Sequence, residues 1–118
     1  MTRPNVAYKI IDAADWDAAQ VAGAYAGSAV DLADGYIHMS TSAQLAETAG
    51  KHYRGRLDLV LVEVDLSQLD VTWEASRGGA LFPHLYAPLP LTAAVSERGL
   101  SVDAEGVMRF EDGAIGWP

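Results

Sequence analysis

The stretch LDLVLVEVD, Leu57 to Asp65, constrains the fold more than any other part of the chain. Its apolar run extends to Val62 and does not alternate with polar residues. A strand with one solvated face alternates, whereas an apolar run is typical of a strand that is buried on both faces. We therefore expect a central strand here, with the sheet continuing on both sides.

An earlier segment combines a strand with a helix. VAYKII (Val6–Ile11) is mostly apolar and β-branched, which predicts a strand. Asp12 then ends the strand and is a suitable helix N-cap, and Gly23 is a suitable stop. The buried face of this helix is expected at the spacing i, i+4 and i+7, which gives Ala14, Ala18 and Val21.

A second strand–helix pair follows between Gly35 and Tyr53. The period of two in GYIHMS places Tyr36, His38 and Ser40 on one face of a strand. Thr41 or Ser42 then caps a helix. Its buried stripe is expected at Leu45, Ala49 and Tyr53.

The remainder of the chain predicts mainly strands. Strands are expected at VTWEA and LTAAVSE, and an extended piece limited by prolines is expected at HLYAPL. A hairpin is expected to turn at Glu105–Gly106. The order of strand, helix, strand, helix and then several strands predicts an α+β fold with two early helices packed against a strand-rich body. A length of 118 residues suits one domain, spanning residues 1–118.

Charge and cysteine content limit the functions to consider. The chain has 8 Lys and Arg against 16 Asp and Glu, a formal net charge of −8. Such a field repels phosphate backbones, so duplex nucleic acid is not an expected partner, although backbone N–H groups could still hold a small anion. The chain has no cysteine, which excludes disulfides and thiol chemistry. Neither a signal-peptide core nor a membrane-length apolar run is present, so we expect a cytoplasmic protein that does not enter a membrane.

His38 opens the first group of candidate site residues. Ser40, Thr41 and Ser42 follow it where the strand passes into the helix. Capping needs one hydroxyl, so the others and the free N–H groups of the first turn could bind an anionic or ribose-bearing ligand. His38 could be a half-buried strand histidine bonded to a hydroxyl, or a ligand contact, since titratable groups beside hydroxyls concentrate in sites.

The stretch SRGGALFPHLY holds the second group. Gly78 and Gly79 permit backbone that other residues avoid, and Arg77 could grip a carboxylate or phosphate. His84 and Tyr86 share one strand face. A structural loop is the alternative, but connecting loops seldom gather Arg, Gly-Gly, His and Tyr so closely, which favours a site.

Glu74 lies near the end of the VTWEA strand, just before this loop. It is a candidate acid, base or electrostatic stabiliser, and a solvated edge charge is the alternative. Together with His38 and His84 it could in principle form a metal site of two histidines and one carboxylate. No metal-ligand spacing such as His-x-His supports this, so no metal is expected.

Four motifs in order, YKI, DGYIHMST, LVLVEVD and WEASRGGALFPHLYAPL, resemble a bacterial family known as domain of unknown function nine-fifty-two. The resemblance spans roughly Tyr8 to Val95. It implies an ADP-ribosyltransferase-like fold, which is a split, strand-rich α+β body with a central cleft.

The resemblance also implies roles within such a fold. One branch of these transferases binds NAD with an arginine on the first strand, a Ser-Thr-Ser box on the second and a catalytic glutamate on a later strand. The positions that correspond here are Lys9, Ser40–Thr41–Ser42 and Glu74. The chain departs from this pattern in two places. Lys9 offers a point charge where arginine offers a planar fork. Thr72 stands where a Glu or Gln is expected, two residues before Glu74. The other branch uses His and Tyr, for which His38, His84 and Tyr86 would serve.

Two functions are therefore to be tested. The first is an enzyme that binds NAD or a related nucleotide as its substrate and transfers or hydrolyses at the N-glycosidic bond, with a carboxylate stabilising the oxocarbenium ion. The expected catalytic residues are Glu74 and His84, and the expected ligand-binding residues are His38, Ser40, Thr41, Arg77, Tyr86 and Lys9. The second is a non-catalytic ligand-binding module that keeps the cleft. No protein partner is indicated.

Overall fold

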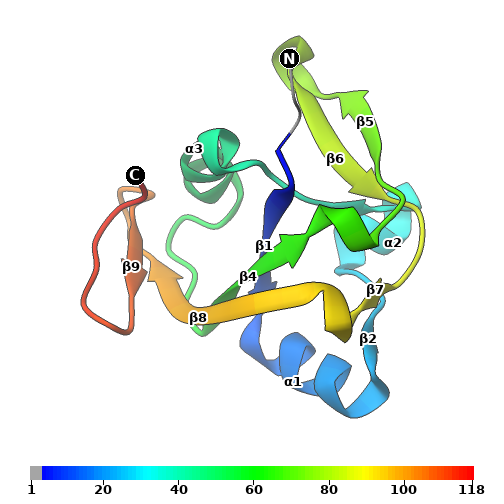
Figure 1. The fold of residues 1–118 in the computed structure, drawn as a ribbon. Coiled ribbons are helices and arrows are strands. Elements are labelled where there is room, and N and C mark those ends of the chain that lie inside the picture. Colours follow the sequence, from blue (N-terminus) through cyan, green and yellow to red (C-terminus); the bar gives the residue numbers. More distant parts are fainter. Residues whose placement is uncertain (1–3) are drawn as a thin grey trace.

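A computed structural model describes residues 4–118 of the chain (Figure 1). Its helices are α1 (Ala13–Ala22), α2 (Ala29–Asp34) and α3 (Ser42–His52), with short 3-10 turns η1 (Leu66–Gln68), η2 (Arg77–Gly79) and η3 (Leu91–Ala93). Its strands are β1 (Val6–Asp12), β2 (Ala24–Tyr25), β3 (Ile37–His38), β4 (Leu59–Asp65), β5 (Thr72–Ala75), β6 (Leu81–Leu85), β7 (Leu89–Pro90), β8 (Ala94–Val102) and β9 (Met108–Phe110). The expected α+β class is confirmed.

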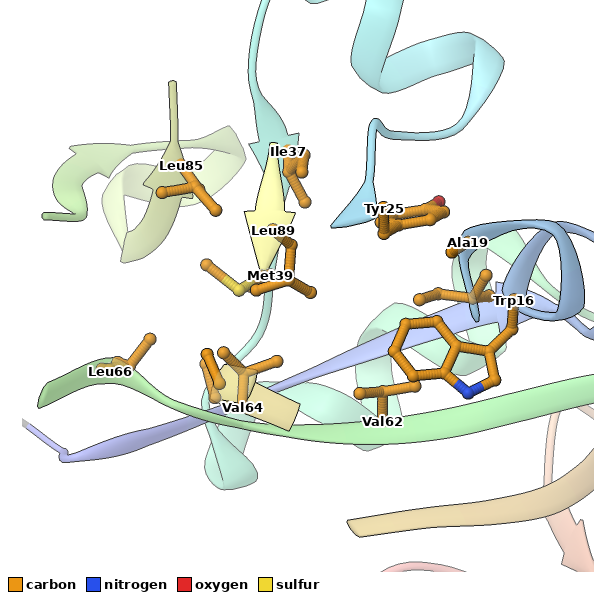
Figure 2. Packing of buried hydrophobic residues seen from close by; sticks show 13 residues of the cluster. Trp16, Ala19, Tyr25, Ile37, Met39, Val62, Val64, Leu66, Leu85 and Leu89 are labelled. Atoms are coloured by element: carbon orange, nitrogen blue, oxygen red, sulfur yellow. The ribbon is translucent and has the colours of Figure 1, made fainter. Parts of the chain in front are cut away.

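The larger sheet is built around β4. Its strand order is β1-β4-β8-β9, and all neighbours are antiparallel. Leu59 and Leu61 pack into one buried cluster, whereas Val62 and Val64 pack into the other, because successive side chains point to opposite faces. Figure 2 shows Val62 and Val64 on the side of the sheet that faces Met39. The prediction of a central strand buried on both faces is therefore confirmed.

Two smaller sheets complete the strand-rich body, with the orders β3-β6-β5 and β2-β7. Reciprocal backbone hydrogen bonds of 2.7 and 2.9 Å between Tyr8 and Ser40 link β1 to the segment after β3. The hairpin expected at Glu105–Gly106 lies between β8 and β9, as predicted. Of the expected LTAAVSE strand, the first three residues form η3 and the strand begins at Ala94.

Helix α1 forms where expected, but the prediction of its buried face is wrong. Trp16 and Ala19 are buried, whereas Val21 is 92% exposed and Ala14 and Ala18 face solvent. The indole of Trp16 carries far more apolar area than a valine, so its burial sets the rotation of the helix. Figure 2 shows Trp16 beside Tyr25 and Val62.

Helix α3 agrees with its prediction. Thr41 is the N-cap residue, and the Gln44 side chain accepts a 2.9 Å hydrogen bond from the Thr41 backbone N–H. Leu45 and Ala49 are buried, and Tyr53 packs partly buried against the same cluster.

Helix α2 was not expected, and it is the element that completes the site. The hydroxyl of Ser28 accepts from the backbone N–H of Asp31 at 3.1 Å, while the Asp31 carboxylate accepts from the Ser28 N–H at 2.9 Å. This reciprocal capping box starts the helix. Gly35, with φ of 89°, ends it.

Candidate active site

A cleft of about 700 Å³ lies between β1, α2 and α3 and reaches β3 and β6. Polar and aromatic groups from all these elements line it. The lining residues with potential chemistry include Tyr8, Lys9, Asp31, Asp34, Tyr36, His38, Ser40 and His84. A cleft of this volume is large enough for a small molecule.

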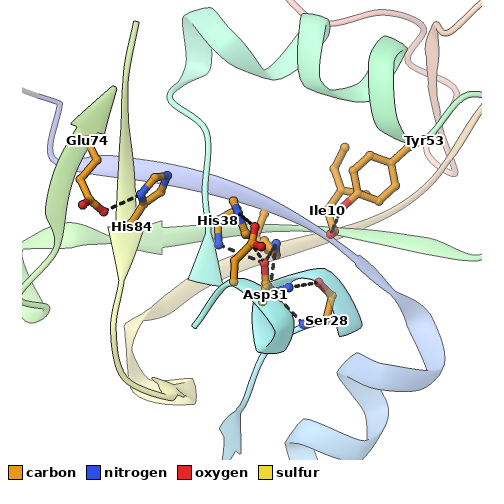
Figure 3. A network of polar contacts seen from close by, with 9 residues as sticks. Ile10, Ser28, Asp31, His38, Tyr53, Glu74 and His84 are labelled. Atoms are coloured by element: carbon orange, nitrogen blue, oxygen red, sulfur yellow. Dashed lines mark hydrogen bonds and ion pairs between the residues drawn. The ribbon is translucent and has the colours of Figure 1, made fainter. Parts of the chain in front are cut away.

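Asp31 is the hub of the polar network in the cleft (Figure 3). Its side chain is 1% exposed. It lies 3.1 Å from the ammonium of Lys9, accepts the backbone N–H of His38 at 3.1 Å, and contacts the His38 ring Nδ1 at 2.6 Å. With the Ser28 N–H, four donors surround one carboxylate, which is how a buried charge is held in a protein.

These contacts set the ionisation of Asp31 and Lys9. Burial by itself raises the pKa of Asp31, but the charge of Lys9 and the hydrogen bonds from Ser28 and His38 outweigh it, so the pKa lies below its ordinary value of 3.8. Burial lowers the pKa of Lys9, and the Asp31 carboxylate opposes that shift. Asp31 is thus ionised at neutral pH.

His38 lies between two carboxylates. Its Nδ1 is 2.6 Å from Asp31, and its Nε2 is 2.9 Å from Asp34, the last residue of α2. An ionised carboxylate only accepts hydrogen bonds, so both contacts are hydrogen bonds only when both ring nitrogens carry protons. With Nε2 protonated, His38 is a hydrogen-bond donor to Asp34.

His84 has a different environment. Its Nδ1 lies 2.8 Å from Glu74 on the neighbouring strand, and the carboxylate of Glu74 also accepts a 2.6 Å hydrogen bond from the hydroxyl of Tyr86. Since Glu74 only accepts, Nδ1 carries the proton. No hydrogen bond among the described residues engages Nε2, and the His84 ring lines the cleft. His84 can therefore take a proton at Nε2.

The contact between Tyr86 and Glu74 changes the ionisation of both groups. The hydrogen bond to Glu74, with burial and the carboxylate charge, raises the pKa of Tyr86 to about 12. The same hydrogen bond, with the one from His84, lowers the pKa of Glu74 below 4.5. Glu74 is therefore a charged partner for His84 across the neutral range.

Tyr36 joins the two histidine networks. Its ring stacks on His84 with centroids 4.1 Å apart, and it lies 4.5 Å from the His38 ring and 5.1 Å from the Tyr86 ring. His38 and His84 are directly opposite each other in the β3–β6 ladder. The expected shared face of Tyr36 and His38 is thus confirmed, and it includes His84.

Ser40 and Thr41 are more enclosed than free hydroxyls of a binding box would be. The Ser40 hydroxyl lies 2.9 Å from the hydroxyl of Thr48 on α3, and the Ser40 residue is 4% exposed. Thr41 is buried at the N-cap and does not line the cleft. Both residues therefore hold β1, β3 and α3 together.

The structure brings most of the predicted residues to one region. Lys9, His38, Ser40 and His84 line the cleft, whereas Glu74 and Tyr86 lie behind His84 and do not line it. The side chain of Arg77 lies outside what the structure describes.

Asp31 is the functional residue that the sequence reasoning missed. Its signal was the pattern Ser28-x-x-Asp31, which is a capping box. Within residues 4–118, no three His, Asp or Glu side chains are arranged to hold a metal ion.

The fold and site define an α+β protein with a cleft whose wall holds His38 and His84, each of which contacts a carboxylate. The chain belongs to the family described as protein of unknown function DUF952, which matches residues 10–97. The resemblance noted from the sequence motifs is thereby confirmed at the level of the family.

Solved structures of one relative agree with this fold. The crystal structure of protein CC0527 from Caulobacter crescentus is 52% identical, covers 88% of this chain and 93% of its own, and superposes with a TM-score of 0.83. Its solution NMR structure is 51% identical, covers 87% and 90%, and gives a TM-score of 0.75. No curated protein matches the chain. No helix within residues 4–118 is long and apolar enough to span a membrane, and the cytoplasmic location stays a prediction.

Proposed function

We propose that this chain is a cytoplasmic protein with the ADP-ribosyltransferase-like fold, and that it acts on NAD or a related nucleotide at the N-glycosidic bond. The observation that carries the proposal is the His84–Glu74 pair, in which Glu74 holds Nδ1 at 2.8 Å and the His84 residue lines the cleft. A base oriented in this way by a carboxylate is a recurring feature of hydrolytic and transfer sites.

The His84–Glu74 pair suits the removal of a proton from the nucleophile. The bond between ribose C1′ and the nicotinamide nitrogen breaks, its electrons stay on nicotinamide, and C1′ becomes cationic. Water or an acceptor hydroxyl then attacks C1′ while His84 Nε2 takes its proton. For hydrolysis the products are ADP-ribose, nicotinamide and the proton released by His84.

Glu74 acts in this proposal through His84. Its carboxylate holds Nδ1 and is itself held by Tyr86, so it fixes the tautomer that leaves Nε2 able to accept a proton. This differs from the direct stabilisation of the oxocarbenium ion that was expected of a catalytic glutamate. Glu74 is therefore a positioning residue and His84 the catalytic base.

The cleft offers further support for ligand binding. His38 is 34% exposed and presents Nε2 from the cleft wall. The buried Asp31 holds both the ring and the backbone N–H of His38, and the buried Lys9 holds Asp31 in turn. His38 is thus the donor best placed to contact the nucleotide, with Lys9 acting through Asp31.

Nicotinamide release from NAD, followed by chromatography, tests the proposal. Wild-type protein is expected to release nicotinamide, and His84→Ala to lower kcat roughly a hundredfold while calorimetry shows NAD still bound. Thermal unfolding of His84→Ala checks that the fold survives. Wild-type protein that binds NAD without releasing nicotinamide would contradict catalysis, and protein that does neither would contradict the whole proposal.

A non-catalytic binding module is the second candidate, and a specific observation favours it. The Ser40 hydroxyl is engaged by Thr48, and Lys9 is engaged by Asp31, so two positions that the family resemblance assigns to NAD serve the protein's own structure. A binding module would hold its ligand as tightly in Glu74→Gln as in wild type, and more weakly in His38→Ala.

A further inference from the structure

Two aspartates contact His38 from different environments. Asp31 is 1% exposed and is fixed by four donors, whereas Asp34 is 48% exposed at the end of α2. Asp34 contacts the His38 Nε2 at 2.9 Å, and both residues line the cleft. Of the two ion pairs, the outer one is the weaker, because exposed pairs contribute little stability.

The lysine and arginine side chains on the cleft wall are arranged in ion pairs. Each lining cation within the described residues has a lining carboxylate as its partner, namely Lys9 with Asp31, Lys51 with Glu47 and Arg56 with Asp12. Within the described residues, the Asp34 carboxylate forms an ion pair with His38 alone. Displacing Asp34 from Nε2 therefore breaks no second ion pair.

The position of Asp34 in its helix also allows its side chain to leave His38. It is the last residue of α2, where the exposed carbonyl groups disfavour a negative charge. The helix is instead stabilised at its start by the Ser28–Asp31 capping box. Rotation of the Asp34 side chain into solvent leaves these contacts intact.

We infer that Asp34 occupies, in the free protein, the place on His38 Nε2 that a phosphate oxygen of the ligand takes. Asp34 then limits the affinity of the cleft for phosphate-bearing ligands, because a ligand must displace one carboxylate to reach the donor. This inference rests on the cleft assigned above as the nucleotide site, and it makes Asp34 a residue that determines specificity.

Calorimetric titration of inorganic pyrophosphate, and separately of NAD, tests the inference. Asp34→Asn is expected to bind pyrophosphate about threefold more tightly than wild type, which is the strength of an exposed ion pair. Asp34→Glu keeps the charge and is expected to show no gain. Asp70→Asn removes an exposed carboxylate that does not line the cleft, and is expected to match wild type.

The outcomes separate this inference from the proposed function. Tighter pyrophosphate binding by Asp34→Asn that disappears when His38→Ala is added supports the inference, even if NAD binds to neither protein, which would remove only the NAD proposal. NAD binding that is equal in wild type and Asp34→Asn overturns the inference and leaves the proposed function in place. A gain that persists without His38, or no pyrophosphate binding by any variant, also overturns the inference.

Discussion

Glu74 and His84 meet across neighbouring strands, with Oε1 of Glu74 2.8 Å from Nδ1 of His84. They are diagonal neighbours in the β5–β6 ladder, since Thr72 is the residue directly opposite His84. Tyr86 completes the contact with a 2.6 Å hydrogen bond to the same carboxylate oxygen. The ladder therefore places Glu74 and Tyr86 where they fix the orientation of the His84 ring through Nδ1.

Titration of Tyr86 reports directly on this contact. Its pKa is raised to about 12 by the hydrogen bond to Glu74, so Glu74→Gln, which removes the charge, is expected to move the pKa back toward 10.0. Tyrosinate absorbance measures this as the difference between each protein and its Tyr86→Phe counterpart. Ionisation of Tyr86 near 10 in wild-type protein would show that the contact is absent.

Asp31→Asn tests the buried hub. The substitution leaves Lys9 buried beside a neutral group, so we expect a loss of about 3 to 5 kcal/mol in the free energy of unfolding at pH 7. Because the pKa of Asp31 in the folded protein lies below 3.8, the contribution of its charge is present above about pH 4 and is lost as the pH falls through the folded value.

Urea unfolding at several pH values measures this effect. The difference between wild type and Asp31→Asn is expected to be constant near neutral pH and to shrink in acid. Asp34→Asn is the matched control and is expected to cost less than about 1 kcal/mol, because that pair is exposed. Equal losses for the two variants would contradict the account of Asp31.

Gly27→Ala is expected to disturb Asp31 from outside the polar network. A Cβ on Gly27 would lie 2.8 Å from the Cβ of Asp31, and the φ of Gly27 is +116°. Gly35→Ala is the control, because Gly35 also has a positive φ of +89° but a Cβ there meets nothing within 4 Å. We expect a loss of about 1 kcal/mol for Gly35→Ala and clearly more for Gly27→Ala in urea unfolding. Similar losses would mean that backbone strain alone decides the effect.

Ser40→Ala tests the structural role of the hydroxyl box. Loss of the 2.9 Å contact with Thr48 is expected to cost about 1 kcal/mol, whereas Ser42→Ala at an exposed position is expected to cost less than about 0.5 kcal/mol. A double-mutant cycle with Thr48→Val measures the coupling in denaturant unfolding. A coupling energy near zero between Ser40 and Thr48 would contradict this structural role and would leave the Ser40 hydroxyl available to a ligand.

The sequence predicted those parts of the fold that local patterns determine. The apolar run ending at Val62 identified the central strand, and Thr41 with the stripe Leu45 and Ala49 identified α3. The rotation of α1 was missed because a regular spacing was given more weight than the size of Trp16. Helix α2 has six residues and almost no apolar stripe, so its capping box was its main signal.

The site was predictable as a set of residues but not as an arrangement. His38, His84, Glu74 and Tyr86 stood out by residue type, yet their pairing depends on strands β3, β5 and β6, which are distant in the sequence. The choice of partner for each histidine follows from that pairing. Lys9 was expected to contact the ligand, whereas its burial against Asp31 required a helix that the sequence reasoning did not place.

Steady-state nicotinamide release from NAD by Glu74→Gln is the most direct test of the central claim that Glu74 orients His84 as a catalytic base. We predict a fall in kcat of at least about tenfold with KM nearly unchanged, because Glu74 does not line the cleft. Glu105→Gln, in the exposed turn between β8 and β9, is the matched control and is expected to keep the wild-type rate. Nicotinamide release by Glu74→Gln at the wild-type rate, or a change in KM alone, would contradict the claim.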